Sequence, residues 1–230
     1  SLVLVDRSGA SRPAVGETHN YHSPRFSPDG QRIAVDFTTP DGRDVWVLRL
    51  ADGTLSRTTF VTDGHDPSWG PGADDLSFVS ARSGVLGLYR IRPGGAAPAE
   101  SLFASTQLGY TGIWLQDQSA VVTAGAGLAP DSRTDIGIVR NGGRGPIDPV
   151  VATRFEEQSP ALSPDDQWLA FMSTQSGREE VYVRRLDGTG AQVQISLAGG
   201  TEPVWGPSGQ ELFYRATSAG QAELMAATLQ

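Results

Sequence analysis

Polar residues of types able to bind a ligand recur at one position of a repeated motif in this 230-residue chain. The motif copies begin at Pro24, Pro67, Gly112, Pro160 and Pro203. The two residues before each copy differ from copy to copy: His22 and Ser23, His65 and Asp66, Tyr110 and Thr111, Gln158 and Ser159, Thr201 and Glu202. Side chains that a repeat does not share are not needed to build it. We therefore take these ten residues as candidate ligand-binding or partner-binding residues.

Metal chemistry is the first alternative for these positions. Imidazole and carboxylate groups of His22, His65, Asp66 and Glu202 are of the types that hold a divalent cation, which makes them weak metal candidates. They lie far apart in the sequence and match no ligand-spacing rule. We expect no metal site and no cofactor.

The acids of the repeated turn raise a similar question. Asp29 and Asp165 each provide one carboxylate per turn, whereas calcium takes six to eight oxygen ligands from a compact loop. We expect these carboxylates to accept backbone N–H groups within the turn instead.

Catalytic motifs are missing from the sequence. It contains no Gly-x-Ser-x-Gly, no His-Glu-x-x-His and no phosphate loop. A glycosidase could still pair Glu156 or Glu157 with Asp66 or Glu202. We expect no catalytic residues in this chain.

An aromatic residue is also part of the motif. Trp69, Trp114 and Trp205 occupy one repeat position, and Phe26 and Leu162 occupy it in the other two copies. A large side chain repeated in this way indicates core packing between repeats rather than ligand stacking. Trp46 and Trp168 lie in or beside apolar runs, and we expect them in the core too.

Composition narrows the class of protein. The 28 glycines and 15 prolines suit many short strands joined by tight turns, including Asp-Gly pairs of the kind that form hairpins. The net charge of −8, without a basic cluster, argues against nucleic acid as a partner. No run of 18 apolar residues occurs, so we expect no membrane insertion. The start has no signal-peptide pattern, and we expect the chain to be an excerpt of a longer protein.

The elements that position these residues are strands. Each motif copy is followed by β-rich runs, and the repeat period is roughly 45 residues, which is typical of a β-propeller blade with four antiparallel strands. We predict an all-β, single-domain propeller over residues 1–230 that forms most of a six-bladed ring, with a closed five-bladed ring as the alternative. The predicted segments are 1–20 (partial), 21–62, 63–106, 107–154, 155–198 and 199–230 (partial). In a propeller the ten candidate residues would gather at one mouth of the central channel.

The motif resembles the WD40-like (PD40) repeat of bacterial TolB-type propellers. Residues 26–30 match it in full, residues 162–166 nearly so, and the other copies more weakly. The absence of lysine among the 18 basic residues fits a GC-rich bacterial genome. The resemblance covers nearly the whole chain and implies the propeller fold.

A narrower resemblance involves four segments. Residues 4–9, 44–47, 181–184 and 209–215 together are similar to propellers at the C-terminus of bacterial transmembrane Ser/Thr protein kinases. That likeness implies an extracytoplasmic module that senses or binds, in a membrane-anchored protein whose kinase domain lies elsewhere.

The expected function is therefore recognition of a small ligand or protein partner at the channel mouth, without bond chemistry. One alternative is a periplasmic scaffold of the TolB kind, which binds envelope proteins over its faces. Another is a propeller glycosidase or the propeller half of a peptidase. An open propeller edge would also allow a homodimer.

Overall fold

The computed structural model describes residues 1–110, 112–125, 127–218 and 221–229. The chain forms two compact units, Ser1–Thr106 and Gln107–Gln230, which are described separately. Their boundary coincides with the one predicted between segments 63–106 and 107–154. No helix in the described ranges is long and apolar enough to cross a membrane.

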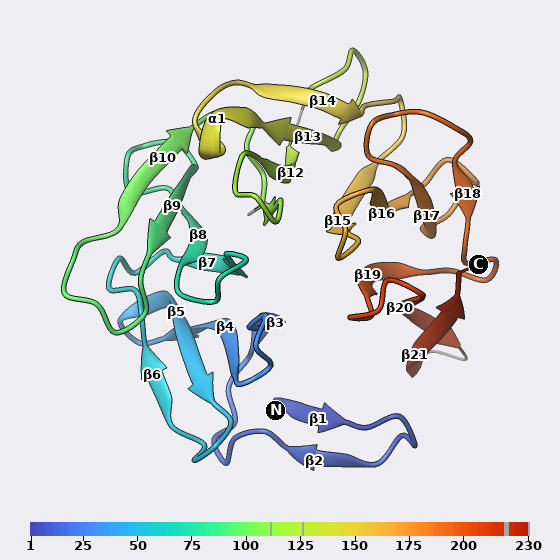
Figure 1. Ribbon diagram of the computed structural model, residues 1–230. Coiled ribbons are helices and arrows are strands. Elements are labelled where there is room, and N and C mark those ends of the chain that lie inside the picture. The colour runs from blue at the N-terminus through green and yellow to red at the C-terminus, as the bar shows by residue number, and fades with distance from the viewer. Residues whose placement is uncertain (111, 126, 219–220, 230) are drawn as a thin grey trace. The chain divides into compact units, whose positions relative to one another are not determined.

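The first unit contains a two-stranded sheet and two four-stranded sheets, with consecutive strands paired antiparallel (Figure 1). The small sheet is β1 (Val3–Val5) and β2 (Ser11–Pro13). The first blade is β3 (His22–Phe26), β4 (Arg32–Thr39), β5 (Gly42–Arg49) and β6 (Leu55–Arg57). The second blade is β7 (His65–Trp69), β8 (Leu76–Ser80), β9 (Gly87–Ile91) and β10 (Glu100–Ala104).

The second unit contains three blades built in the same way. The third blade is β11 (Ile113–Trp114), β12 (Val121–Gly125), β13 (Asp135–Val139) and β14 (Ile147–Val151), with the short α1 (Arg140–Gly143) before β14. The fourth blade is β15 (Glu157–Leu162), β16 (Trp168–Ser173), β17 (Glu180–Arg185) and β18 (Val193–Gln194). The fifth blade is β19 (Thr201–Trp205), β20 (Glu211–Ser218) and β21 (Gln221–Thr228).

These sheets confirm the predicted all-β propeller with four-stranded antiparallel blades. The described residues form five blades, of which the last has three strands. Every motif copy coincides with the first strand of a blade. The partial segment 1–20 contains β1 and β2, which pair with each other. Closure into a ring stays a prediction.

Packing between neighbouring blades of one unit explains the apolar second strands. In β16 residues 169–173 are all buried, with Leu169 and Phe171 packed against the third blade and Ala170 against the fifth. Phe78 and Tyr89 of the second blade pack with Ala34, Val45 and Val47 of the first. Because neighbouring side chains cover both faces of such a strand, its sequence reads as a continuous apolar run rather than an alternating one.

The motif tryptophans add a hydrogen bond to this packing. Trp69 Nε1 donates to the carbonyl oxygen of Arg25 in the preceding blade at 3.0 Å, and Trp205 Nε1 donates to that of Ala161 at 3.1 Å. Trp69 and Trp114 are buried, which confirms the predicted core role at this position.

Phe26 corrects that prediction in the first copy, because its side chain is 58% exposed. The repeat position alone does not decide burial, since Trp114, which lies in the first blade of its own unit, is buried. Trp46 and Trp168 are also less buried than expected, and both are partly exposed.

The repeated turns behave largely as expected. Asp29 Oδ1 accepts the N–H of Gln31 at 3.0 Å, and Asp165 Oδ1 accepts that of Gln167 at 3.1 Å, which confirms the turn role of these acids. Asp63-Gly64 is the exception among the Asp-Gly pairs. It lies between blades, where Asp63 accepts hydrogen bonds from Ser80 and Ala81.

We predict that the aromatic residue at this repeat position contributes different amounts to the free energy of unfolding in different blades. Trp69→Ala should lower the free energy of unfolding by about 3–5 kcal/mol because it leaves a cavity between blades. Phe26→Ala should change it by less than about 1 kcal/mol because that side chain is mostly exposed. Urea unfolding of the two variants measures the difference, and equal costs would contradict this account of blade packing.

Candidate functional site

The candidate residues lie on a backbone bulge that recurs in the blades. In β3, β7, β15 and β19 three residues oppose two on the next strand, beginning at His22, His65, Gln158 and Thr201. The residue before the motif proline has a left-handed backbone in each case. The φ values are 48° for Ser23, 49° for Asp66, 52° for Ser159 and 54° for Glu202.

We call these two-residue segments the bulge pairs: His22–Ser23, His65–Asp66, Gln158–Ser159 and Thr201–Glu202. Residues other than glycine seldom adopt this conformation, because Cβ approaches the following carbonyl oxygen. A bulge also re-aims the side chains around it. The blades therefore share one strained backbone shape and differ in the polar groups that it presents. Thr111, of the remaining copy, lies outside the described residues.

In the first unit a hydrogen bond joins the two bulge pairs. Ser23 Oγ donates to Asp66 Oδ1 at 2.6 Å, and His65 Nδ1 lies 3.0 Å from Asp66 Oδ2. Asp66 thus contacts Ser23 of the neighbouring blade through one carboxylate oxygen and His65 of its own blade through the other. The side chain of Asp66 is 17% exposed and that of His65 is 21% exposed, so the cluster is accessible from solvent.

Two further residues complete this cluster and were not among the predicted site residues. The N–H of Asp66 donates to Asp36 Oδ1 at 3.0 Å, and Arg43 Nε donates to Asp36 Oδ2 at 2.5 Å. Asp36 is fully buried in β4, opposite His22. An aspartate within the apolar run 33–37 was the sequence signal that could have revealed it.

The pKa values of Asp36 and Asp66 are shifted in opposite directions. Burial raises the pKa of Asp36 above its usual value of 3.8, although Arg43 opposes the shift. Burial acts on the pKa of Asp66 in the same direction, but hydrogen bonds from His65 and Ser23 outweigh it and lower that pKa below 3.8. Asp66 is therefore held as the charged member of the cluster.

The order of contacts bears on what this cluster can do. In a hydrolytic triad the imidazole lies between the nucleophilic hydroxyl and the carboxylate. Here the Asp66 carboxylate lies between Ser23 and His65, so the imidazole is not placed to take the hydroxyl proton. The arrangement suits hydrogen bonding to a ligand rather than nucleophilic attack.

In the second unit each bulge pair has its own partners. Gln158 Nε2 donates to Thr134 Oγ1 at 3.2 Å, and Arg215 donates to Glu202 Oε1 at 3.0 Å in a largely exposed ion pair. The side chain of Tyr110 is 47% exposed. These groups stand in solvent and are accessible to a partner.

The carboxylates of the glycosidase alternative are engaged in structural contacts. Glu157 is buried and accepts the hydroxyl of Thr153 at 2.5 Å, and Glu156 pairs with Arg133 at 3.2 Å. Over the described residues, no group of three or more His, Asp or Glu side chains could hold a metal ion.

Buried acids at the start of the third strands were also missed by the sequence reasoning. Asp44 accepts hydrogen bonds from Arg57, Thr59 and the Val61 N–H. Asp135 and Glu180 occupy the corresponding starts of β13 and β17. The signal is an acid directly before an apolar run, as in 44–47, 135–138 and 180–183. These acids secure the loop that follows or precedes the strand, which is a structural role.

Comparison with known proteins identifies relatives by structure only. No family model and no curated protein matches the sequence. A TolB structure from Agrobacterium tumefaciens is 19% identical, with a TM-score of 0.81 over 99% of this chain and 83% of that one. TolB from Acinetobacter baumannii is 14% identical, with a TM-score of 0.71 over 86% of this chain and 50% of that one.

An enzyme also contains this fold. The tricorn protease is 17% identical, with a TM-score of 0.71 over 95% of this chain and 23% of that one. At these identities the likeness establishes a TolB-like β-propeller fold. The fold alone does not assign the activity, since one fold serves many functions.

We predict that the Asp66 charge stabilises the first unit in a pH-dependent way. Because the folded-state pKa is lowered, this contribution is complete above the ordinary value of 3.8 and is lost as pH falls through the folded-state pKa. Asp66→Asn keeps an oxygen for Ser23 and tolerates positive φ, but it removes the charge beside His65. The difference in unfolding free energy between wild type and variant should therefore shrink as the solution is acidified.

Urea unfolding at a series of pH values measures that difference. The matched control is Asp131→Asn, which removes an exposed aspartate with a similarly left-handed φ of 63°. A gap between wild type and Asp66→Asn that stays constant with pH would show that the cluster does not depend on this charge.

Proposed function

We propose that this chain is a non-enzymatic propeller scaffold that binds a protein partner with its bulge pairs and Tyr110. The observation that carries the proposal is the shared left-handed bulge with unshared side chains. A strained backbone is kept where the surrounding structure over-determines it, and such positions are concentrated at functional sites. Variable polar groups on a rigid frame are the usual design of a recognition surface.

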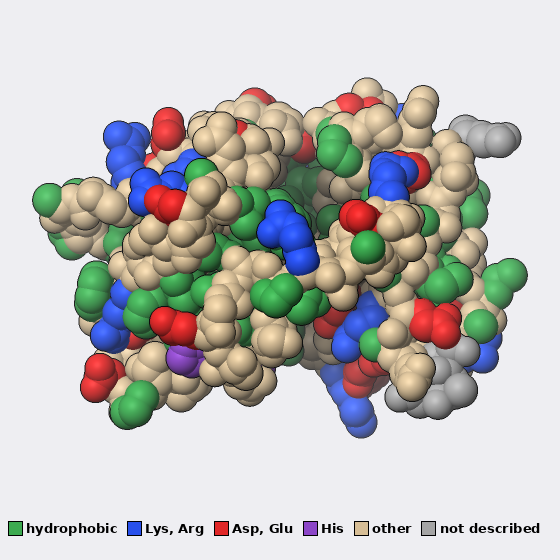
Figure 2. All heavy atoms as spheres, turned by 90° about the horizontal axis from the view of Figure 1, so that it is seen from below, with side chains coloured by type: hydrophobic (Ala, Val, Ile, Leu, Met, Phe, Trp, Pro, Cys, Tyr) green, Lys and Arg blue, Asp and Glu red, His purple; other side chains and the backbone are tan. Residues whose placement is uncertain are grey.

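The chemistry of the exposed groups supports a polar partner surface. In the second unit Glu202 and Tyr110 present a carboxylate and a phenol to solvent. Figure 2 shows acidic, basic and apolar side chains interspersed on the face that it draws. Surfaces that form non-obligate protein complexes are about as apolar as the rest of a protein surface, so such a mixture is compatible with one.

The TolB-like fold favours a scaffold role over a kinase-linked sensor, because the structural relatives include TolB proteins. We further propose an extracytoplasmic location, as the resemblance to TolB-type propellers implies. The sequence flanking this chain in the full gene distinguishes the alternatives. A kinase domain with a membrane helix upstream would support the sensor, and an α/β-hydrolase domain downstream would support a peptidase.

A homodimer is a second proposed association, through the edge of the fifth blade. In the described residues β21 pairs with β20 alone, and its Leu224 side chain is 68% exposed. An unpaired strand edge is a template for strand addition. Light scattering should show a dimer that Leu224→Lys weakens and Val193→Lys, on β18, does not. A wild-type monomer at about 100 μM would overturn this proposal.

The scaffold proposal predicts that the partner contacts the bulge pairs and Tyr110. A photoreactive phenylalanine analogue placed at Tyr110 or Glu202 should form a cross-link to a defined protein in the source cells. The same analogue at Val193, an exposed residue of β18, serves as the control and should not form it. Identical cross-linking from all three positions, or none from Tyr110 and Glu202, would contradict the proposed surface.

A further inference from the structure

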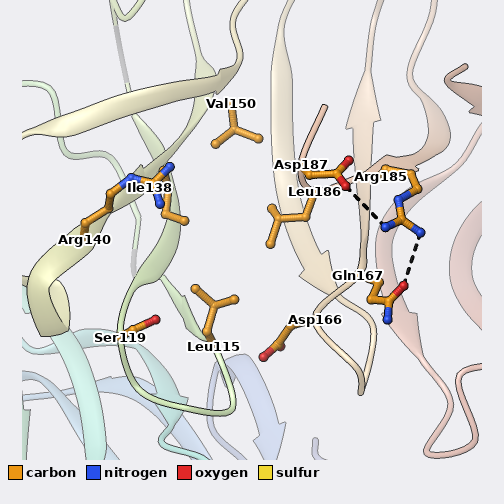
Figure 3. A pocket seen from close by; sticks show the side chains of 10 residues that line it. All are labelled: Leu115, Ser119, Ile138, Arg140, Val150, Asp166, Gln167, Arg185, Leu186 and Asp187. Atoms are coloured by element: carbon orange, nitrogen blue, oxygen red, sulfur yellow. Dashed lines mark hydrogen bonds and ion pairs between the residues drawn. The ribbon is translucent and has the colours of Figure 1, made fainter. Parts of the chain in front are cut away.

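A pocket of about 440 Å³ lies within the second unit, between the third and fourth blades (Figure 3). Its volume is within the range of small-molecule and side-chain sites, roughly 300–1,000 Å³. Most of the residues that line the pocket follow the first and third strands, whereas the bulge pairs lie at the start of the first strands. Ser159 lies near the start of β15, and Asp166 comes after the end of that strand. The pocket is therefore separate from the bulge pairs of this unit.

Part of the pocket lining is apolar. Leu115 and Val150 of the third blade and Leu186 of the fourth are partly buried, and they pack against the core cluster that contains Ile138. Figure 3 shows these side chains on opposite sides of the opening. An aliphatic chain that entered the pocket would contact all of them and remove apolar surface from water.

Asp166 supplies the distinctive polar group. Its Oδ2 accepts the N–H of Gln116 at 2.6 Å, which directs the carboxylate toward the third blade. Its Oδ1 is buried, and no described residue donates to it. The residue has a left-handed φ of 58°, so the side chain is held in place by the turn. A buried acceptor without a donor costs free energy, and a positive charge close to the carboxylate would offset part of that cost.

The two arginines that line the pocket have carboxylate partners. Arg185 contacts Asp187 at 3.3 Å and Gln167 at 3.2 Å, and its guanidinium lies over the Trp168 ring, although its buried Nε has no acceptor among the described residues. Arg140 lies 3.5 Å from Asp148. Among the described residues Asp166 has no cationic partner, so the unmatched charge of the pocket is negative.

The electrostatic environment of Asp166 also favours a nearby cation. Burial raises the pKa of its carboxyl, the nearby Asp117 and Asp165 raise it further, and the Gln116 N–H opposes the shift. A cation placed beside the Asp166 carboxylate would relieve the repulsion among these three carboxylates. Of the three, Asp166 alone lines the pocket. One carboxylate offers too few oxygens to select a calcium ion, which leaves an organic cation as the matching group.

We propose that this pocket binds the lysine side chain of a protein partner. The ammonium group would pair with the Asp166 carboxylate where it lines the pocket, and the four-carbon stem would lie along Leu115, Val150 and Leu186. Lysine combines these two features, because its stem packs on apolar surface while its charge seeks a partner. The inference rests on the proposed scaffold function only for the statement that the lysine belongs to a protein.

The test uses Nα-acetyl-lysine methylamide as the probe and the uncharged norleucine analogue as its control. NMR titration near pH 7 should show saturable shifts at the amides of Leu115, Gln116 and Leu186 with the lysine probe. The norleucine probe should bind about tenfold more weakly, because it keeps the stem and lacks the ammonium. Equal affinity for the two probes, or shifts confined to the first unit, would overturn the proposal.

Two variants distinguish the role of the Asp166 carboxylate in binding from an effect on folding. Asp166→Asn keeps an acceptor for Gln116 and tolerates the left-handed backbone, and it should weaken the lysine probe about tenfold or more. Asp131→Asn, matched in backbone conformation but outside the pocket, should leave binding unchanged. Unaltered binding in Asp166→Asn, with its folding verified by circular dichroism, would refute the role of Asp166.

Failure of this proposal is distinguishable from failure of the scaffold function. Loss of probe binding in Asp166→Asn, with cross-links from Tyr110 and Glu202 retained, supports two separate surfaces. Probe binding without any cross-linked protein supports the pocket and contradicts the scaffold. Cross-links without probe binding support the scaffold and contradict the pocket.

Discussion

Within each unit, burial of one blade against its neighbour is the constraint on which the rest of the structure depends. A four-stranded sheet has two faces, and in β16 of the fourth blade the buried residues 169–173 are covered by side chains of the third blade on one face and of the fifth on the other. The Trp69 and Trp205 ring N–H groups fix this contact by bonding a carbonyl of the preceding blade. With the blades held in this way, the ends of the strands are free to carry polar groups that the core does not need.

Buried acids hold the loops at those ends. Asp44 accepts three hydrogen bonds from residues 57–61, and Glu180 accepts hydrogen bonds from Ser196 and the Gly199 N–H. Burial of a charge is tolerable only where it is paired or hydrogen-bonded. These contacts fix the segment that leads into the next blade and so help to position its bulge pair. Structural acids and candidate binding residues are thus adjacent, and only their contacts distinguish them.

The sequence was sufficient to predict the blades and the recurrence of the candidate positions, because both follow from a periodic motif. It could not show that Ser23, Asp66, Ser159 and Glu202 adopt a left-handed backbone, since the following proline does not require one. It also missed Asp36, whose contact with Asp66 joins residues of neighbouring blades. Phe26 was assigned to the core from the average behaviour of its repeat position, whereas the burial of that position differs from blade to blade, with Trp114 buried and Phe26 exposed.

Asp166 illustrates a second limit of sequence reasoning. Its motif position predicts an ordinary turn residue. Only the structure shows that Gln116 of another blade donates to its Oδ2 and that its Oδ1 is buried without a donor. The two proposed surfaces therefore arise from one principle, in which equivalent turns and bulges differ in the side chains they carry. The repeat supplies the geometry, and departures from the repeat supply the specificity.

The measurement that tests the central claim most directly is hydrogen exchange of the protein with and without its cross-linked partner. The account predicts slower exchange at residues 22–23, 65–66, 158–159 and 201–202, where the bulge pairs lie. Protection confined to the outer strands β6, β10, β14 and β18, with unchanged exchange at the bulge pairs, would contradict it.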